Sequence, residues 1–275
     1  MSKDLAEELH FQTLTRTSDP WKTVSSIIMT VVDEAYFEAG SDGLTFRSMD
    51  PSHIALVDLN WPGSDFDEYK CPSTIKFGFR ITEFAKLAKR MNPNDSMEVA
   101  IKDNSLCIRS TGSYARSYKM NLIESSGSNT SPLPQLSFDS KMDISISAFD
   151  KILSDIQVIS DNITMETVAG TDGAKFSGRR DNADAMVKVG NNDFDNKSRN
   201  NNNNIIGNPI IDLRVNENSK SSYNIDYISK VVKAISSISD GYMTLEFSSK
   251  KPLRLGFVIQ GTLKAQFFLA PRADN

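Results

Sequence analysis

The sequence Ser41-Asp42-Gly43-Leu44-Thr45-Phe46 recurs in similar form 130 positions later as Thr171-Asp172-Gly173-Ala174-Lys175-Phe176, which indicates a duplicated fold. A second echo pairs residues 79–86 with residues 223–230, which lie 144 positions further along. The 14 additional positions match the length of an Asn-rich tract at residues 191–204. We therefore predict two copies of one domain, the second carrying a polar insertion.

The first spacing also pairs two residues beyond the turn with equivalents in the second copy: Ala55 with Ala185 and Val57 with Val187. It predicts an N-terminal domain over residues 1–122, an interdomain linker over 123–136 and a C-terminal domain over 137–275. The linker is flexible at its Gly/Ser-rich end and stiffer near its prolines. Leu133 in this linker either packs against the nearest hydrophobic core or forms part of the wall of a pocket.

Composition limits the class of protein. A chain of 275 residues accommodates two domains that need no disulfide staples. Cys71 and Cys107 form no C-x-x-C pair and fit reduced thiols of a cytosolic protein. No segment reaches the roughly 18 apolar residues of a membrane span, and residues 1–10 are too charged for a signal peptide, so we expect a frayed leader.

The alternation of apolar residues predicts seven short strands in each half, all of them after residue 36. Four amphipathic helices interrupt the strands, two in each half. The first begins with Pro20 behind a Ser18 or Asp19 cap and directs residues as far as Ala35 inward, and Ser147 caps the third. The predicted fold class is α+β, with antiparallel sheets covered by helices.

Seven cations fall on the polar faces of these helices: Lys22, Lys86, Lys89, Arg90, Lys151, Lys230 and Lys233. The net charge of −4 does not itself point to a nucleic-acid partner. The cations fit either an ordinary solvated face or contact with a polyanion. The matching positions of Lys86 and Lys230 in the two repeats favour the polyanion.

No catalytic arrangement emerges from the sequence. The only histidines are His10 and His53, so neither a His-based metal site nor a Ser-His-Asp triad has support. Phosphate-binding glycine motifs are missing. Asp50 and Asp58 could be paired carboxylates, although a turn residue and a solvent-facing residue explain them better. We expect no enzyme activity, no cofactor and no metal.

Three motifs carry a family resemblance: Ser48-Met49-Asp50-Pro51-Ser52-His53-Ile54-Ala55-Leu56-Val57, Phe66-Asp67-Glu68-Tyr69-Lys70-Cys71 and Leu269-Ala270-Pro271. With them the chain resembles the proliferating cell nuclear antigen (PCNA) type of DNA sliding clamp. The resemblance implies a trimeric ring with helices inside and sheets outside. Such a ring encircles double-stranded DNA without reading its sequence and without catalysis, as a polymerase processivity factor in DNA replication and repair. Its implied partners are DNA polymerase, flap endonuclease, DNA ligase and a clamp loader.

The resemblance also implies sites. All seven cations enter the predicted DNA-binding set, although Ser154 stands where clamps often carry a basic residue. The implied partner-peptide pocket comprises Met49, His53, Leu56, Leu133, Pro252, Phe268, Leu269, Ala270 and Pro271, and Ser131 replaces an apolar residue beside it. The implied subunit interface pairs residues 114–122 with 182–190 through Tyr114, Tyr118, Met120, Ala185 and Val187.

Thr171 replaces a lysine that eukaryotic clamps carry, and the tail lacks an acidic extension. Both favour an archaeal clamp acting in the cytoplasm on chromosomal DNA; a virus stays open, and the location would be nuclear in a eukaryote. Two other classes also stay open: a subunit of a heteromeric or checkpoint-type clamp or a β-rich interaction scaffold, and a hydrolase using Asp carboxylates, for which loss of turnover in Asp50→Ala would be the test. The sequence does not decide between a homotrimer and a heterotrimer.

Overall fold

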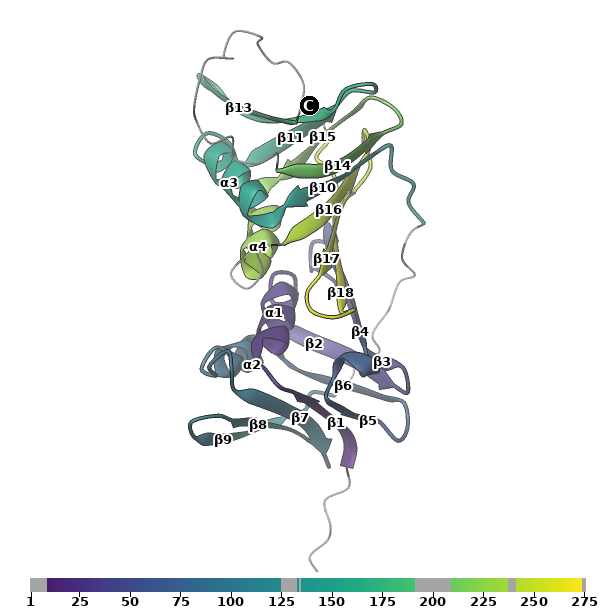
Figure 1. Cartoon of the computed structure of the whole chain (residues 1–275), viewed down its shortest axis with the longest axis vertical. Coiled ribbons are helices and arrows are strands. Elements are labelled where there is room, and N and C mark those ends of the chain that lie inside the picture. The colour runs from purple at the N-terminus through teal and green to yellow at the C-terminus, as the bar shows by residue number, and fades with distance from the viewer. Residues whose placement is uncertain (1–8, 125–132, 134, 191–208, 237–240, 274–275) are drawn as a thin grey trace, which may run out of the picture. The chain divides into compact units, whose positions relative to one another are not determined.

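The computed structural model describes residues 9–124, 133, 135–190, 209–236 and 241–273 (Figure 1). It divides into two compact units, one formed by Met1–Pro132 with Val258–Ala265 and the other by Leu133–Phe257 with Gln266–Asn275. The Asn-rich tract at 191–204 and Ser131 lie outside the described residues. Within the described residues, no helix is long and apolar enough to cross a membrane.

The first unit contains two antiparallel layers with strand orders β5-β1-β7-β8-β9 and β4-β3-β2-β6. Its strands are β1 (Leu9–Thr15), β2 (Glu34–Gly40), β3 (Gly43–Met49), β4 (Ala55–Pro62), β5 (Glu68–Lys70), β6 (Ile75–Arg80), β7 (Ser96–Lys102), β8 (Ser105–Thr111) and β9 (Ala115–Asn121). Its helices are α1 (Asp19–Ile28), α2 (Ile81–Ala88) and the short 3-10 turn η1 (Gly63–Asp65). The helices α1 and α2 pack against each other.

The second unit has the same plan, with strand orders β14-β10-β16-β17-β18 and β13-β12-β11-β15. Its strands are β10 (Ser140–Ser145), β11 (Asn162–Thr167), β12 (Gly173–Arg180), β13 (Ala183–Gly190), β14 (Ile210–Val215), β15 (Ser219–Asn224), β16 (Tyr242–Phe247), β17 (Leu253–Val258) and β18 (Lys264–Leu269). Its helices α3 (Ile146–Gln157) and α4 (Ile225–Ser236) also contact each other. Each strand and each α-helix of one unit thus has a counterpart in the other, which confirms the duplication and the α+β class.

The turn motif sits in the same place in both units. Gly43 opens β3 with a φ of 144°, where an added Cβ would lie 2.3 Å from the carbonyl oxygen of Trp61, so only glycine fits. Gly173 opens β12 after the same Asp-Gly step. The first echo therefore marks a repeated hairpin.

The predicted pairing of Ala55 with Ala185 is wrong by two residues. Phe46 of β3 faces Leu59 of β4, and the equivalent Phe176 faces Val187, so Leu59 is the counterpart of Val187. The reason is loop length, because residues 50–54 connect β3 to β4 whereas only residues 181 and 182 connect β12 to β13. The spacing of 130 holds through β3 and β12 and fails on both sides of them, since Phe37 of β2 and Met165 of β11, which face Phe46 and Phe176, lie 128 positions apart.

Several predicted boundaries also change. Helix α1 ends at Ile28, and Ala35 lies in β2, where it is buried as a strand residue. Ser145, not Ser147, caps α3, since its side chain accepts a hydrogen bond from the Ala148 amide. Four strands were not predicted, namely β1, β5, β10 and β15, and β1 begins at Leu9, inside the expected leader.

Each unit encloses its own core. In the first, Trp21 of α1 meets Trp61 of β4 with ring centroids 4.8 Å apart, and Phe84 of α2 joins them at 5.5 Å from Trp21. In the second, aliphatic residues dominate, and Phe149 packs edge-on against Phe176 at 5.6 Å. Burying one such side chain contributes about 1.5–3 kcal/mol. The apolar faces of the helices are therefore held inward, and their polar faces are left to solvent.

Candidate nucleic-acid interface and partner surfaces

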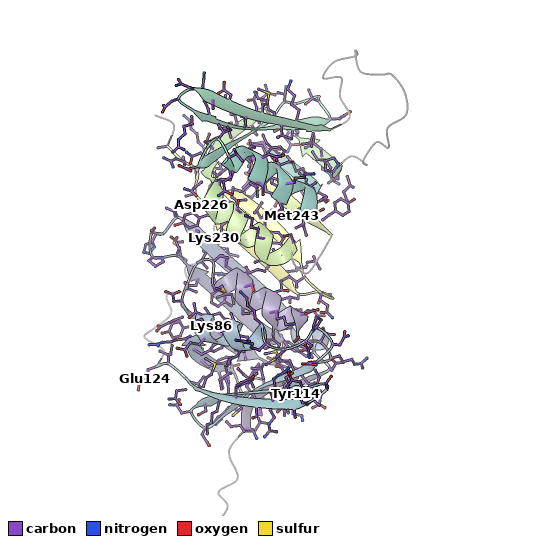
Figure 2. All side chains as sticks on the ribbon, turned by 90° about the vertical axis from the view of Figure 1, so that its left-hand side faces the viewer. Lys86, Tyr114, Glu124, Asp226, Lys230 and Met243 are labelled. Atoms are coloured by element: carbon purple, nitrogen blue, oxygen red, sulfur yellow. The ribbon has the colours of Figure 1, made fainter. Side chains whose placement is uncertain are left out.

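Helix α2 presents a cationic face. Phe84, Ala85 and Ala88 bury its apolar side, while Lys89 is exposed. Lys86, labelled in Figure 2, is exposed as well. Arg90 follows the helix and is also exposed. The three positive charges surround the helix C-terminus, where they complement the helix dipole.

Helix α4 presents an equivalent face. Lys230 and Lys233 are exposed and lie 144 positions after Lys86 and Lys89, on helices that begin 144 positions apart. Figure 2 labels Lys86 and Lys230, the first lysine of each pair. The Lys230 ammonium lies 6.0 Å from the centroid of the Tyr227 ring. The acid of this helix, Asp226, accepts a hydrogen bond from Gln157 of α3 at 2.7 Å. Both helix faces therefore offer paired lysines one turn apart.

Helix α1 departs from the prediction that all cations lie on solvated faces. The side chain of Lys22 is only 14% exposed, and its Nζ lies 3.2 Å from Oδ1 of Asp19, which neutralises it. On α3, Lys151 is exposed, but so are Ser154 and Asp155. The cations available to a polyanion therefore concentrate on the second helix of each unit.

The strands of the predicted subunit interface lie at sheet ends. β9 pairs only with β8, and β13 pairs only with β12, among the described strands. Tyr114 precedes β9 and is 61% exposed. The other predicted interface residues are half-buried: Tyr118, Met120, Ala185 and Val187. Each strand thus leaves one row of backbone groups open for pairing.

Asp95 organises the start of β9. Its carboxylate accepts hydrogen bonds from the Asn92 amide at 3.0 Å and from Arg116 of β9 at 2.7 Å. The Arg116 guanidinium lies 4.0 Å from the centroid of the Tyr114 ring. The backbone N–H of Asn92, followed by Arg116, holds the pKa of Asp95 below its usual value. Sequence reasoning missed Asp95, because no motif marks it.

Three predicted pocket residues belong to the first unit. Asp50 is buried and holds the loop 50–54, since its carboxylate accepts N–H groups from Ile54 at 2.8 Å and Ala55 at 2.7 Å. The loop places His53 at a φ of 59°, exposed to solvent. Met49 is 37% exposed and Leu56 is buried. Asp50 is thus the turn residue that the sequence favoured over a paired carboxylate, and Asp58 instead bonds Arg47 at 2.6 Å.

The remaining pocket residues belong to the second unit. Leu133, Pro252, Ala270 and Pro271 are half-exposed, whereas Phe268 and Leu269 are buried. Leu269, 1% exposed, offers almost no surface to a partner.

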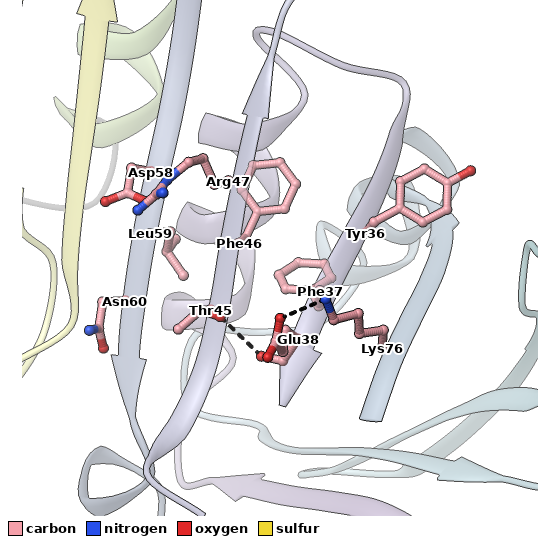
Figure 3. Close-up of a pocket in the computed structure, with 10 residues that line it drawn as sticks. All are labelled: Tyr36, Phe37, Glu38, Thr45, Phe46, Arg47, Asp58, Leu59, Asn60 and Lys76. Atoms are coloured by element: carbon pink, nitrogen blue, oxygen red, sulfur yellow. Dashed lines mark hydrogen bonds and ion pairs between the residues drawn. The ribbon is translucent and has the colours of Figure 1, made fainter. Parts of the chain in front are cut away.

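A cavity of about 270 Å³ lies on the layer β6-β2-β3-β4 of the first unit (Figure 3). The residues that line it include Thr45, Glu38 and Lys76. Its charges are paired, with Lys76 3.2 Å from Glu38. The Thr45 hydroxyl donates to the backbone carbonyl of Glu38 at 3.3 Å and not to a carboxylate. Among the described residues, no group of His, Cys, Asp and Glu could hold a metal ion.

Models of the two PCNA domains match the chain, the N-terminal domain over residues 14–125 and the C-terminal domain over 132–272. The chain belongs to the proliferating cell nuclear antigen family. A DNA polymerase sliding clamp of Nitrosopumilus maritimus is 41% identical over 96% of this chain and 99% of its own. The resemblance to PCNA-type clamps, inferred from the three motifs, is confirmed. The relative from Nitrosopumilus maritimus is archaeal.

Solved structures agree with the PCNA fold. PCNA from Thermococcus kodakaraensis superimposes with a TM-score of 0.84 at 20% identity, over 95% of this chain and 100% of that one. PCNA of A. fulgidus, solved with the C-terminal region of FEN-1, gives 0.80 at 22% identity over 96% and 99%. These identities establish the fold of the two clamp domains.

Proposed function

We propose that three copies of this chain close into a ring that encircles duplex DNA and holds DNA polymerase on it. The observation that carries the proposal is the matched pair of exposed lysines on equivalent helices, Lys86 with Lys89 and Lys230 with Lys233, in a member of the PCNA family. The ring acts by closing around the DNA duplex, and the chain performs no catalysis.

The lysines contact phosphates and not bases. Lysine is a flexible point charge without the planar fork that reads a base edge, so its attraction to the backbone is independent of sequence. A contact of this kind permits sliding, because each phosphate offers the same charge as the next. Arg90 extends the patch on α2, while Lys151 contributes less because Asp155 accompanies it on α3. Lys22 acts only weakly, since Asp19 holds it.

The ring closes through the open edges of β9 and β13. Each subunit carries one edge on each unit, so every contact joins unlike edges head to tail. Tyr114, Tyr118 and Met120 pack on one side of the contact, and Ala185 and Val187 pack on the other. Main-chain hydrogen bonds between β9 of one subunit and β13 of the next fix the antiparallel orientation of the two strands.

Client enzymes dock short peptides through the predicted pocket residues: Met49, His53 and Leu56 in the first unit, and Leu133, Pro252, Phe268, Leu269, Ala270 and Pro271 in the second. The half-exposed prolines and the adaptable Met49 suit an apolar peptide. The FEN-1 segment solved with A. fulgidus PCNA supports a flap endonuclease as one client. DNA ligase and the clamp loader would use the same surface, and the archaeal relatives support a location on the chromosome in the cytoplasm.

The test is topological. Labelled protein is loaded by a clamp loader onto a nicked circular plasmid, and the complex is passed through a gel-filtration column. The proposal predicts that the protein travels with the circle and is lost when a restriction enzyme linearises the DNA. Equal retention on circles and linear DNA would show adhesion instead of encirclement and would overturn the proposal.

A further inference from the structure

The open edges of β9 and β13 carry side chains in two rows. In β9, Arg116, Tyr118 and Met120 are half-buried and lie beside the buried Ser110, Ile108 and Leu106 of β8. In β13, the half-buried row is Ala185, Val187 and Val189, beside Gly178, Phe176 and Ala174 of β12. Each half-buried row therefore continues the core side of its own sheet, and the exposed rows continue the outer side.

Backbone directions on β9 are fixed by one bond. The Leu122 amide donates to the Asn104 carbonyl at 3.3 Å, one step beyond the pair of Ser105 and Asn121. Because bonding alternates along an antiparallel pair, even-numbered residues of β9 bond β8. The N–H and C=O groups of odd-numbered residues, including Lys119, therefore point to the open edge.

Backbone directions on β13 follow from its hairpin. Residues 181 and 182 alone connect the pair Arg180 and Ala183. A two-residue hairpin closes on a hydrogen-bonded pair, so odd-numbered residues of β13 bond β12. The even-numbered residues, including Asp184, therefore point to the open edge. On both strands the residues with open backbone groups are those of the exposed row.

Because open backbone groups coincide with exposed side chains on both strands, the edges of β9 and β13 can pair with each other. If the exposed rows meet, their backbone groups face each other, and the half-buried rows lie together on the core side. Registers that satisfy this condition differ by steps of two residues. Charge then selects among them.

We infer that β9 of one subunit pairs with β13 of a second copy of this chain in the register that sets Lys119 opposite Asp184, an inference that rests on the proposed ring. A shift of two residues either way would set Lys119 opposite Asn182 or Met186 instead. None of the described residues of its own chain forms an ion pair with Lys119. The side chain of Asp184 is 66% exposed, and its carboxylate lies 3.1 Å from the Arg179 guanidinium. Contact with Lys119 of the second copy therefore places the Asp184 carboxylate between two cations.

The same register fits the half-buried rows. It sets Tyr118 opposite Ala185, a large ring against a methyl group, and Met120 opposite Ala183. Arg116 lies opposite Val187 with its charge already satisfied by Asp95. No bulky pair and no unpaired charge therefore falls on the core side. Because both members of each pair come from this one sequence, the register fits a ring of identical subunits.

Engineered disulfides test the register directly. The starting protein is the full chain with Cys71→Ser and Cys107→Ser. Tyr118→Cys with Ala185→Cys forms a non-hydrogen-bonded pair, whose Cα separation of about 4.5 Å suits a disulfide. Mild oxidation should give bands of two and three linked chains on a non-reducing gel. The matched controls, Tyr118→Cys with Ala183→Cys or with Val187→Cys, are displaced by two residues and should link poorly.

A charge exchange gives an independent readout. Lys119→Glu or Asp184→Lys alone should weaken each subunit contact about tenfold, and the double variant should recover most of the loss. High salt should reduce the difference between the single variants and the unchanged chain.

The outcomes separate two failures. A trimer that links best through a control pair, or whose double variant is weaker than either single one, overturns the register and leaves the clamp proposal intact. A chain that stays single at every concentration overturns the clamp proposal, and the register with it.

Discussion

Ile123 and Arg272 occupy equivalent places in the two units. The Ile123 amide donates to the Gly78 carbonyl of β6 at 2.8 Å, and the Arg272 amide donates to the Ser222 carbonyl of β15 at 2.8 Å. Gly78 and Ser222 lie 144 positions apart, the spacing of the second sequence echo. The chain leaving β9 and the chain leaving β18 thus each cover the edge of the strand that precedes a cationic helix, which protects that edge from unwanted pairing.

Removing residues 272–275 should uncover the β15 edge. The loss includes the Arg272 amide bond and the bond of its guanidinium to Asn162 at 3.0 Å. Because a net hydrogen bond contributes roughly 0.5–1.5 kcal/mol, the free energy of unfolding should fall by about 1–2 kcal/mol. Urea denaturation measures it, and removal of residues 274–275 alone is the control. An unchanged midpoint for the longer deletion would show that the tail contributes nothing.

Reversing Lys86 and Lys230 together should weaken the hold on DNA. Both are exposed and sit at matching positions on α2 and α4. Each phosphate contact that is lost should reduce the slope of log affinity against log salt by about 0.9. The measurement is DNA binding between low and physiological salt for Lys86→Glu with Lys230→Glu. Lys151→Glu, on the helix that also exposes Asp155, is the matched control, and an equal effect there would contradict the division between helices.

Leu133→Ser should weaken client binding without opening the ring. Leu133 is half-exposed, so the change removes an apolar contact with little cost to the core. The affinity for an apolar flap-endonuclease peptide should fall roughly tenfold, a loss of about 1.4 kcal/mol. Titration calorimetry measures it, with an unchanged particle mass as control. Leu269→Ala is a poor alternative, because Leu269 is 1% exposed and its truncation would cost about 2–5 kcal/mol of stability. Peptide binding unaffected by Leu133→Ser would place the docking site elsewhere.

Asp95→Asn should destabilise the first unit in a pH-dependent way. The pKa of Asp95 is lowered by the Asn92 amide and by Arg116, so its stabilising contribution is complete above about 3.9, the ordinary value for aspartate. The contribution disappears as the pH falls through the lowered pKa. Thermal midpoints of the two proteins should therefore differ at pH 7 and converge in acid. A difference that stays constant with pH would show that the charge of Asp95 is unimportant.

The sequence predicts the repeat well because the Asp-Gly turn and the helical period are local signals. Gly43 must be glycine for steric reasons, whereas Gly173 has no positive φ, so the echo marks the equivalent starts of β3 and β12 and not a shared steric requirement. The coincidence of Ala55 with Ala185 misled the alignment, since small residues recur in strands by chance. Only the observed pairing of Phe176 with Val187 reveals the two-residue difference.

The sequence predicts a cationic DNA-binding surface on the helices, but it does not show which of the cations are exposed. Helical spacing placed Lys86 and Lys230 on exposed faces, but spacing could not reveal that Lys22 lies against Asp19 and is mostly buried. Asp95 became visible only through its contact with Arg116 on another strand. Interactions between distant segments depend on strand register, which the residue pattern of a single strand does not contain.

The mass of the isolated chain in solution shows whether three identical subunits close into a ring. One chain weighs 30.5 kDa. Light scattering at micromolar concentration should give three times this value, about 92 kDa, because the edges of β9 and β13 are complementary within one sequence. A particle of one chain's mass that enlarges only when unlike chains are added would contradict a ring of identical subunits.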